Sequence, residues 1–201
     1  MTDLPVLQAV RLKGRVSPAD LARTLDADDA DTEAAVRRLV DAGLLIAGPT
    51  VRISPDGRAR LAELLAAERQ DVESATIDAA YHEFRSVNTD FKALVTDWQL
   101  RDGQPNDHRD ADYDAAVLAR LDDVHQRVTP IIAAVAAQLP RLRGYPVKLA
   151  AALTRVTNGE IAWLTGPLID SYHTVWFELH EELILAAGLT REQAARSGDA
   201  Q

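Results

Sequence analysis

The sequence predicts a mainly helical protein in two parts, with one small two-stranded β-hairpin in the first part. Apolar residues recur every three or four positions over most of the 201 residues, as they do on amphipathic helices. Two short β-like segments, 44–47 and 51–53, are separated only by Gly-Pro-Thr. Proline and glycine mark the expected ends of the helices, and no repeat or low-complexity stretch is evident.

The first part, residues 1–68, is expected to hold four helices and the hairpin. The helices are expected at 4–12, at 17–25, from 32 to about 43, and from 54 onward. Ser17 is a candidate N-cap ahead of Pro18, and Gly43 is a candidate stop. Three helices, a hairpin and a fourth helix are the order of a winged helix-turn-helix domain. In that fold the third helix lies in the major groove of DNA, and the hairpin, or wing, touches the flanking backbone.

The second part, residues 69–201, is predicted to be a helical bundle. Its first helix covers 71–103, with apolar side chains three or four positions apart, and ends at Gly103. Further helices are expected at 112–128, 129–139, 146–157, 160–165 and 168–189. The break at Thr129-Pro130 is expected because proline has no N–H to donate within a helix. The tail from 190 is expected to fray.

Composition and charge exclude several classes of protein. Hydrophobic residues make up 47% and charged residues 26%, so the chain is not wholly disordered. The absence of cysteine excludes disulfide scaffolds, thiolate zinc sites and cysteine nucleophiles. The longest apolar run, 131–139, is well short of the roughly 18 residues of a membrane span. The first residues lack the basic region of a secretory signal, so a cytoplasmic protein without a membrane partner is expected.

Negative charge is concentrated in residues 70–201, after the first third of the chain. The formal net charge is −9, from 22 Lys and Arg against 31 Asp and Glu. Residues 1–69 carry ten and eleven of these, or −1, which leaves 12 and 20, or −8, for the remainder. Because an acidic surface repels phosphates, any nucleic acid is expected to bind the first third.

Four residues are candidate DNA contacts: Thr32, Arg37 and Arg38 on the third helix, and Arg52 on the wing. Five carboxylates crowd the start of the same helix, at Asp26, Asp28, Asp29, Asp31 and Glu33. Acidic residues favour a helix N-terminus, but five exceed what capping needs. DNA binding and a protein-contact role without DNA therefore both stay open.

Three strings in the first part resemble bacterial winged-helix regulators of the MarR kind. SPADLARTL resembles the positioning helix of that family, and AAVRRLVDAGLL its recognition helix with the exit into the wing. ISPDGRARL resembles the family's L-T-x-x-G-R segment, with Ile53, Ser54, Gly57 and Arg58 at the four specified positions. The resemblance covers residues 4–66 and implies a winged helix-turn-helix that regulates transcription.

The second part resembles a C-terminal region of actinobacterial proteins described as MarR-like regulators. The strings that carry this resemblance are TDWQLR, PNDH, YDAAVLARL and SYHTVWFELHEEL, within residues 81–190. The same pattern is similar to modules that accompany phosphoenolpyruvate-utilising phosphotransfer enzymes. The latter similarity implies a regulatory partner of such an enzyme as an alternative function.

Ring-bearing side chains form the candidate ligand site: Trp98, His108, Tyr172, His173, Trp176 and His180. Only 5% of the chain is aromatic, so the rings gathered on the last helix stand out. A hydrogen-bonded core, a small-molecule pocket and a protein interface each explain them. In a long antiparallel bundle, Trp98, His108 and the last helix would converge at one end.

No metal, cofactor or enzymatic activity is expected. His173 and His180 lie about 10.5 Å apart along a helix, too far for one ion. The acidic loop 110–114 is not followed by the glycine and glutamate of a calcium-binding loop. No nucleophile elbow or phosphate-binding glycine loop occurs, and Glu178 and Glu182 are expected on a solvated helix face.

Together these observations predict a transcriptional regulator that binds DNA as a homodimer. Two-fold pairing doubles the phosphate contacts of a single domain. The second part would sense a small-molecule effector or dimerise. The alternative is a winged-helix protein-interaction module without DNA binding, such as a regulatory partner of a phosphotransfer enzyme.

Overall fold

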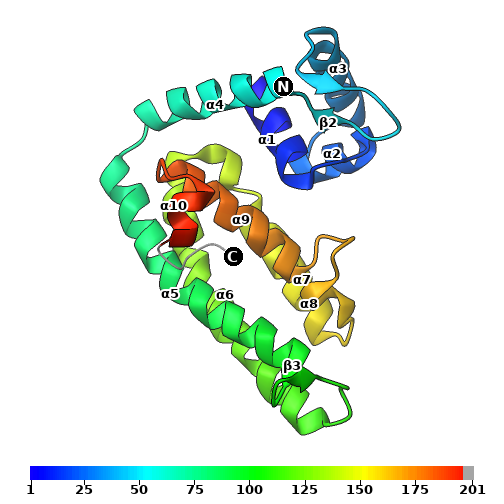
Figure 1. Ribbon diagram of the computed structural model, residues 1–201, viewed down its shortest axis with the longest axis vertical. Coiled ribbons are helices and arrows are strands. Elements are labelled where there is room, and N and C mark those ends of the chain that lie inside the picture. Colours follow the sequence, from blue (N-terminus) through cyan, green and yellow to red (C-terminus); the bar gives the residue numbers. More distant parts are fainter. Residues whose placement is uncertain (197–201) are drawn as a thin grey trace. The chain divides into compact units, whose positions relative to one another are not determined.

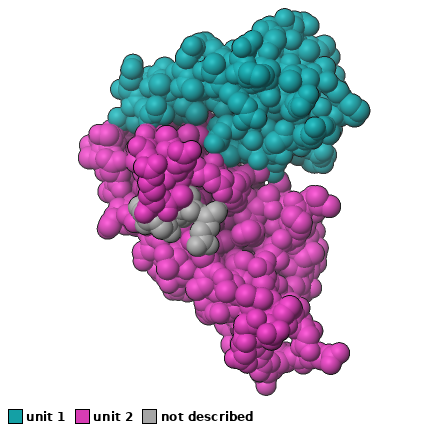
Figure 2. Space-filling model, viewed as in Figure 1, with its two compact units in different colours: residues 1–72 teal, residues 73–201 magenta. Residues whose placement is uncertain are grey.

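The computed structural model describes residues 1–196 and divides into two compact units, residues 1–72 and 73–201 (Figure 2). The division falls at 72/73 instead of the expected 68/69, because the last helix of unit 1 continues to Gln70. The described chain is mainly helical, with two small antiparallel hairpins. Within residues 1–196, every helix is too short or too polar to cross a membrane.

Unit 1 packs four helices with one β-hairpin (Figure 1). Its elements are α1 (Asp3–Lys13), α2 (Pro18–Leu25), α3 (Asp29–Asp41), β1 (Leu45–Ile46), β2 (Arg52–Ile53) and α4 (Pro55–Gln70). Ser17 and Ser54 cap α2 and α4, each accepting a backbone N–H three residues ahead. α3 begins before the expected residue 32, because the Asp28 carboxylate accepts the N–H groups of Ala30 and Asp31.

The hairpin expected at 44–53 is confirmed and gains a third segment. β1 and β2 pair antiparallel, with Leu45 opposite Ile53. Val16, just before α2, exchanges both backbone hydrogen bonds with Val51, at 3.2 and 2.8 Å. Val16, Leu45, Val51 and Ile53 are all buried, so the apolar side of this small sheet completes the core of unit 1.

Unit 2 is built on two long antiparallel helices, Ser74–Gln99 and Ala111–Gln138, and the helix Tyr172–Ala186 packs beside the first of them (Figure 1). Its elements are α5 (Ser74–Gln99), β3 (Leu100–Arg101), β4 (Gln104–Pro105), α6 (Ala111–Gln138), the 3₁₀ turn η1 (Pro140–Leu142), α7 (Tyr145–Thr157), α8 (Ala162–Thr165), α9 (Tyr172–Ala186) and α10 (Arg191–Arg196). Cross-helix ion pairs fix the antiparallel register: Asp97 pairs with Arg120 at 2.5 Å, and Asp90 with Arg127 at 2.7 Å. α9 packs against both α5 and α7.

The expected break at Thr129-Pro130 is wrong, because α6 is one continuous helix. Pro130 removes one helical hydrogen bond, at a typical cost of about 3 kcal/mol. Close by, the Thr129 hydroxyl donates to the carbonyl of His125 at 2.7 Å. Packing along α5 on both sides of the proline outweighs the local propensity.

A second hairpin, which the sequence analysis missed, joins α5 to α6. Leu100 pairs with Pro105 and Arg101 with Gln104, around the two-residue turn Asp102-Gly103. Both turn residues have positive φ, 50° and 76°. Asp-Gly is a strong signal for this tight turn, but the strands are too short to show alternation.

The end of the chain also departs from expectation. α9 begins at Tyr172 instead of 168, with Ser171 as its cap. The part of the tail up to Arg196 forms α10, where the expectation was fraying. Thr190 and Gln193 cap it reciprocally, each side chain accepting the other residue's backbone N–H. Residues 197–201, the rest of that tail, lie outside the described residues.

The expected solvated face of α9 is wrong, because Glu178 and Glu182 are both buried. Glu182 forms a buried ion pair with Arg141 from η1. Burial, followed by the nearby negative charges of Glu182 and Glu178, raises the pKa of Tyr145 well above its usual value. The i,i+4 spacing of the two glutamates is equally compatible with a charged surface and with partners on other elements, so the sequence alone misplaced them.

Gly57, in the ISPDGR string, provides a test of unit 1. A Cβ there would lie 2.0 Å from the backbone oxygen of Leu44, so Gly57→Ala forces the hairpin and α4 apart. We expect a loss of at least about 2 kcal/mol in the free energy of unfolding of unit 1. Gly144→Ala is the matched control, since its Cβ would meet nothing within 4 Å. Equal stability of the two variants in urea denaturation would contradict this packing.

Candidate functional site

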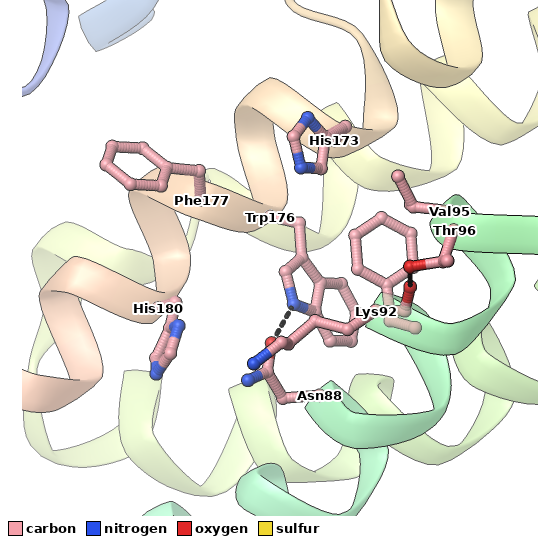
Figure 3. Close-up of a pocket in the computed structure, with 9 residues that line it drawn as sticks. Asn88, Lys92, Val95, Thr96, His173, Trp176, Phe177 and His180 are labelled. Carbon is pink, nitrogen blue, oxygen red and sulfur yellow. Dashed lines mark hydrogen bonds between the residues drawn. The ribbon is translucent and has the colours of Figure 1, made fainter. Parts of the chain in front are cut away.

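A pocket lies between α5 and α9 of unit 2 and encloses a volume of about 220 Å³ (Figure 3). α9 contributes three of the six predicted ligand residues, His173, Trp176 and His180. The remaining lining side chains are Asn88, Phe91, Lys92, Val95, Thr96 and Phe177. All of these are α5 residues except Phe177, which belongs to α9. The helical spacing of the lining residues shows that each helix turns one face toward the pocket.

Trp176 forms the inner wall of the pocket and is 2% exposed. Its indole Nε1–H donates to Asn88 Oδ1 at 2.9 Å, the dashed line in Figure 3. Its ring also packs against the rings of Phe84 and Phe91, with centroids 5.1 and 4.4 Å away. The one polar atom of the indole is thus satisfied inside an aromatic cluster, which fixes how α9 sits on α5.

The two histidines lie one turn to either side of Trp176. His173 lies at the rim, partly exposed and partly covered, with its ring 6.0 Å from that of Phe91. Partial burial of the imidazole lowers the pKa of His173. His180 is buried, and its ring lies 5.2 Å from that of Phe84.

Lys92 is the one lysine or arginine among the nine lining residues, and it is half-buried. Within residues 1–196, its ammonium group has neither an ion pair nor a hydrogen bond. The other cations of α5 and α6 discussed above, Arg120 and Arg127, are each paired with an aspartate. A cation in an apolar hollow without an anion is an arrangement that a bound anion would complete.

Trp98 and His108 lie together but away from this pocket, so the expected convergence of all six residues is not found. Their rings are 4.4 Å apart beside the second hairpin. His108 Nδ1 lies 3.0 Å from Asp114 Oδ2, and Asn106 donates to Trp98 O and Asp114 Oδ1. Trp98 is two helical turns, about 10 Å, beyond Phe91 on α5, which explains the separation. The cluster ties the hairpin to the first turn of α6.

Tyr172 does not line the pocket either. It is fully buried behind Phe91, and its hydroxyl lies 3.2 Å from Nδ1 of His125 on α6. Burial is the main cause that raises the pKa of Tyr172 and lowers the pKa of His125. This pair links α9 to α6 and supports the pocket from behind.

The α5 half of the pocket was missed by the sequence analysis. Asn88, Lys92 and Thr96 follow one another at i,i+4 spacing along the border of the apolar stripe of α5. A polar residue at such a border is usually solvated, so the pattern alone does not mark a site. The one available signal was that a lysine interrupts a sequence region otherwise rich in rings.

The four candidate DNA residues have different surroundings in unit 1. Thr32 is fully buried, so it is removed from the candidate contacts; its apolar neighbours place it in the core. Arg37 pairs with Glu33 at 3.3 Å, and Arg38 with Asp3 at 2.5 Å. Arg52 is exposed on β2.

Comparison of the chain with protein-family models, with curated proteins and with solved structures found no match. Among residues 1–196, no three His, Asp or Glu side chains are grouped so that they could hold a metal ion.

The Asn88–Trp176 hydrogen bond can be tested by substitution. Asn88→Ala leaves the buried indole N–H without its acceptor, so we expect a loss of about 1–3 kcal/mol in the free energy of unfolding. Thr96→Ala, which shortens an exposed side chain on the same helix, should change it by less than about 0.5 kcal/mol. Denaturant unfolding monitored by circular dichroism compares the two variants. A loss no larger for Asn88→Ala than for Thr96→Ala would contradict the role of this bond.

The lowered pKa values of His125 and His173 predict a pH dependence of stability. Below the ordinary histidine pKa of about 6.5, the unfolded chain binds protons that the folded chain does not. Stability is therefore expected to be full above about pH 7 and to fall as the pH drops toward 5.5. The double variant His125→Gln/His173→Gln should show a shallower fall in melting temperature across this range. An equally steep fall in wild type and double variant would refute the assignment.

Proposed function

We propose that this chain is a ligand-responsive regulatory protein, in which unit 2 binds a small molecule and unit 1 contacts the regulated macromolecule. The observation that carries this proposal is the α5–α9 pocket, whose rings and polar groups come from two helices held together by a buried hydrogen bond. Small-molecule sites typically combine apolar and aromatic side chains with convergent polar groups, and the pocket lining contains both kinds. No catalytic step or cofactor forms part of the proposal.

Unit 1 is proposed to be a winged helix-turn-helix of the MarR-like kind. Supporting features are the order of its elements and the backbone bonds that join Val16 to the hairpin at Val51. Gly57 of the ISPDGR string is also explained, because the Leu44 carbonyl occupies the space of a side chain there.

The charges at the start of α3 favour a partner protein with a basic surface as the target of unit 1. The exposed residues near the start of α3 include Asp26, Asp29 and Glu33, while Asp28 is held as the cap. Arg37 is already paired within this helix, and the carboxylates of the helix would face phosphates across a DNA groove. This ranks a protein-contact role above the DNA binding that the element order alone favours.

DNA binding by a cytoplasmic homodimer is the second candidate, and one observation favours it. The backbone bridge between Val16 and Val51 has an arginine next to each of its two residues in sequence, Arg15 and Arg52. Both side chains are exposed, and within residues 1–196 neither guanidinium has an ion pair or hydrogen bond. Exposed arginines without a partner beside a wing are suited to contact DNA phosphates.

Fluorescence anisotropy with a labelled duplex from upstream of the protein's own gene separates the two candidates. At roughly 50 mM salt, where electrostatic binding is strong, we expect no saturable binding by the wild type. Binding that weakens in Arg15→Gln and Arg52→Gln, with a salt slope reduced by about 0.9 for each lost contact, would instead establish the DNA candidate. Arg60→Gln, which removes a cation paired with Glu63 on α4, is the control for net charge.

Ligand-observed NMR with a small-molecule fragment library tests the pocket itself. We expect fragments that bind the wild type and lose affinity in His173→Gln, which keeps the size of the rim residue. His82→Gln, an exposed histidine on α5 that does not line the pocket, should bind as the wild type does. A library without any hit that depends on His173 would overturn the sensing role of unit 2.

A further inference from the structure

We propose that the α5–α9 pocket binds a small organic carboxylate, with the Lys92 ammonium as the counter-charge and the aromatic wall as the seat of the apolar body. This inference rests on the proposed sensing role of unit 2 and adds the chemical class of the ligand.

The charge of the lining is the first argument. Lys92, His173 and His180 are the titratable side chains among the nine lining residues, and none of the nine is an aspartate or glutamate. The surrounding chain is strongly acidic, with −8 from residue 70 onward. A lining of opposite sign within an acidic unit selects anions, because it attracts them where the rest of the surface repels them.

The surroundings of Lys92 give the second argument. Lys92 is half-buried as a residue, and its ammonium has no anionic partner among the described residues. A bound anion would supply that partner. Lys92 lies one turn from Asn88, in the part of the pocket that also holds Trp176 (Figure 3). A carboxylate placed here would gain a charge-assisted hydrogen bond with geometry set by rigid helices.

The composition of the wall and the size of the hollow restrict the ligand further. Phe91, Val95, Trp176 and Phe177 supply an apolar surface suited to a ring or a short hydrocarbon chain. About 220 Å³ is small beside ordinary ligand pockets of roughly 300–1,000 Å³, so the ligand is smaller than a nucleotide. A phosphate group carries close to two negative charges and three strong acceptor oxygens, whereas the lining offers a single lysine, whose charge one carboxylate balances.

Two matched pairs of probes test the inference on the full chain by isothermal titration calorimetry at pH 8. The aromatic pair is 2-naphthoate and 2-naphthalenemethanol, and the aliphatic pair is hexanoate and 1-hexanol. Each pair differs mainly in the carboxylate. A pH of 8 lies well above the ordinary histidine pKa of about 6.5, and burial lowers the pKa of His173 further, so the test is directed at the charge of Lys92.

We expect at least one carboxylate to bind tenfold or more tightly than its alcohol, and Lys92→Gln to remove this preference. Lys148→Gln is the matched control, because it removes the same charge from α7, outside the pocket. The preference for the carboxylate should persist in that control. Unchanged circular dichroism and melting temperature in Lys92→Gln would exclude unfolding as the cause.

The contrary results separate the two levels of the proposal. Equal binding of acids and alcohols that is lost in His173→Gln would overturn the carboxylate class and leave the sensing pocket in place. Carboxylate binding that is equally weakened by Lys92→Gln and Lys148→Gln would assign the preference to net charge and overturn the role of Lys92. Absence of binding by all four probes would overturn the carboxylate inference, while the fragment library decides the pocket separately.

Discussion

The hydrogen bond from the Trp176 indole to the Asn88 amide oxygen is the constraint on which the pocket between α5 and α9 depends. Both groups are buried, so breaking this contact leaves the indole N–H unsatisfied in an apolar environment. The rings of Phe84 and Phe91 hold the indole on two sides. Sliding α9 by one turn along α5 would break all three contacts at once, so the register of the two helices is fixed. His173 and His180 take their places beside the pocket as a consequence.

The charged groups on α9 extend the same argument to the other side of the helix. Glu182 meets Arg141 of η1, and Glu181 meets Arg191 of α10 at 3.1 Å. Buried ion pairs add little net stability, because desolvation offsets much of their attraction. Their value here is positional, because the two pairs tie α9 to η1 and to α10.

The sequence predicted the features that depend on local signals. The Ser17 cap, the first hairpin and the helical periodicity were predicted correctly, because each is encoded within a few neighbouring residues. Pro130 and the glutamates of α9 were misjudged for the opposite reason, since their surroundings are set by residues tens of positions away. The same limit applies to the pocket. The rings on α9 predicted the α9 side of its lining. Asn88 and Lys92 on α5 could not be predicted, because only the packing of α9 against α5 makes them lining residues.

Hydrogen exchange of the tryptophan indoles tests the central contact most directly. In NMR spectra of the full chain, the Trp176 indole signal is assigned by its loss in Trp176→Phe, and the half-buried Trp163 gives an internal comparison. If the Asn88–Trp176 bond closes the inner wall of the pocket, the Trp176 indole exchanges with deuterium far more slowly than that of Trp163, because it must wait for α9 to open. Exchange of the two indoles at the same rate would contradict the account.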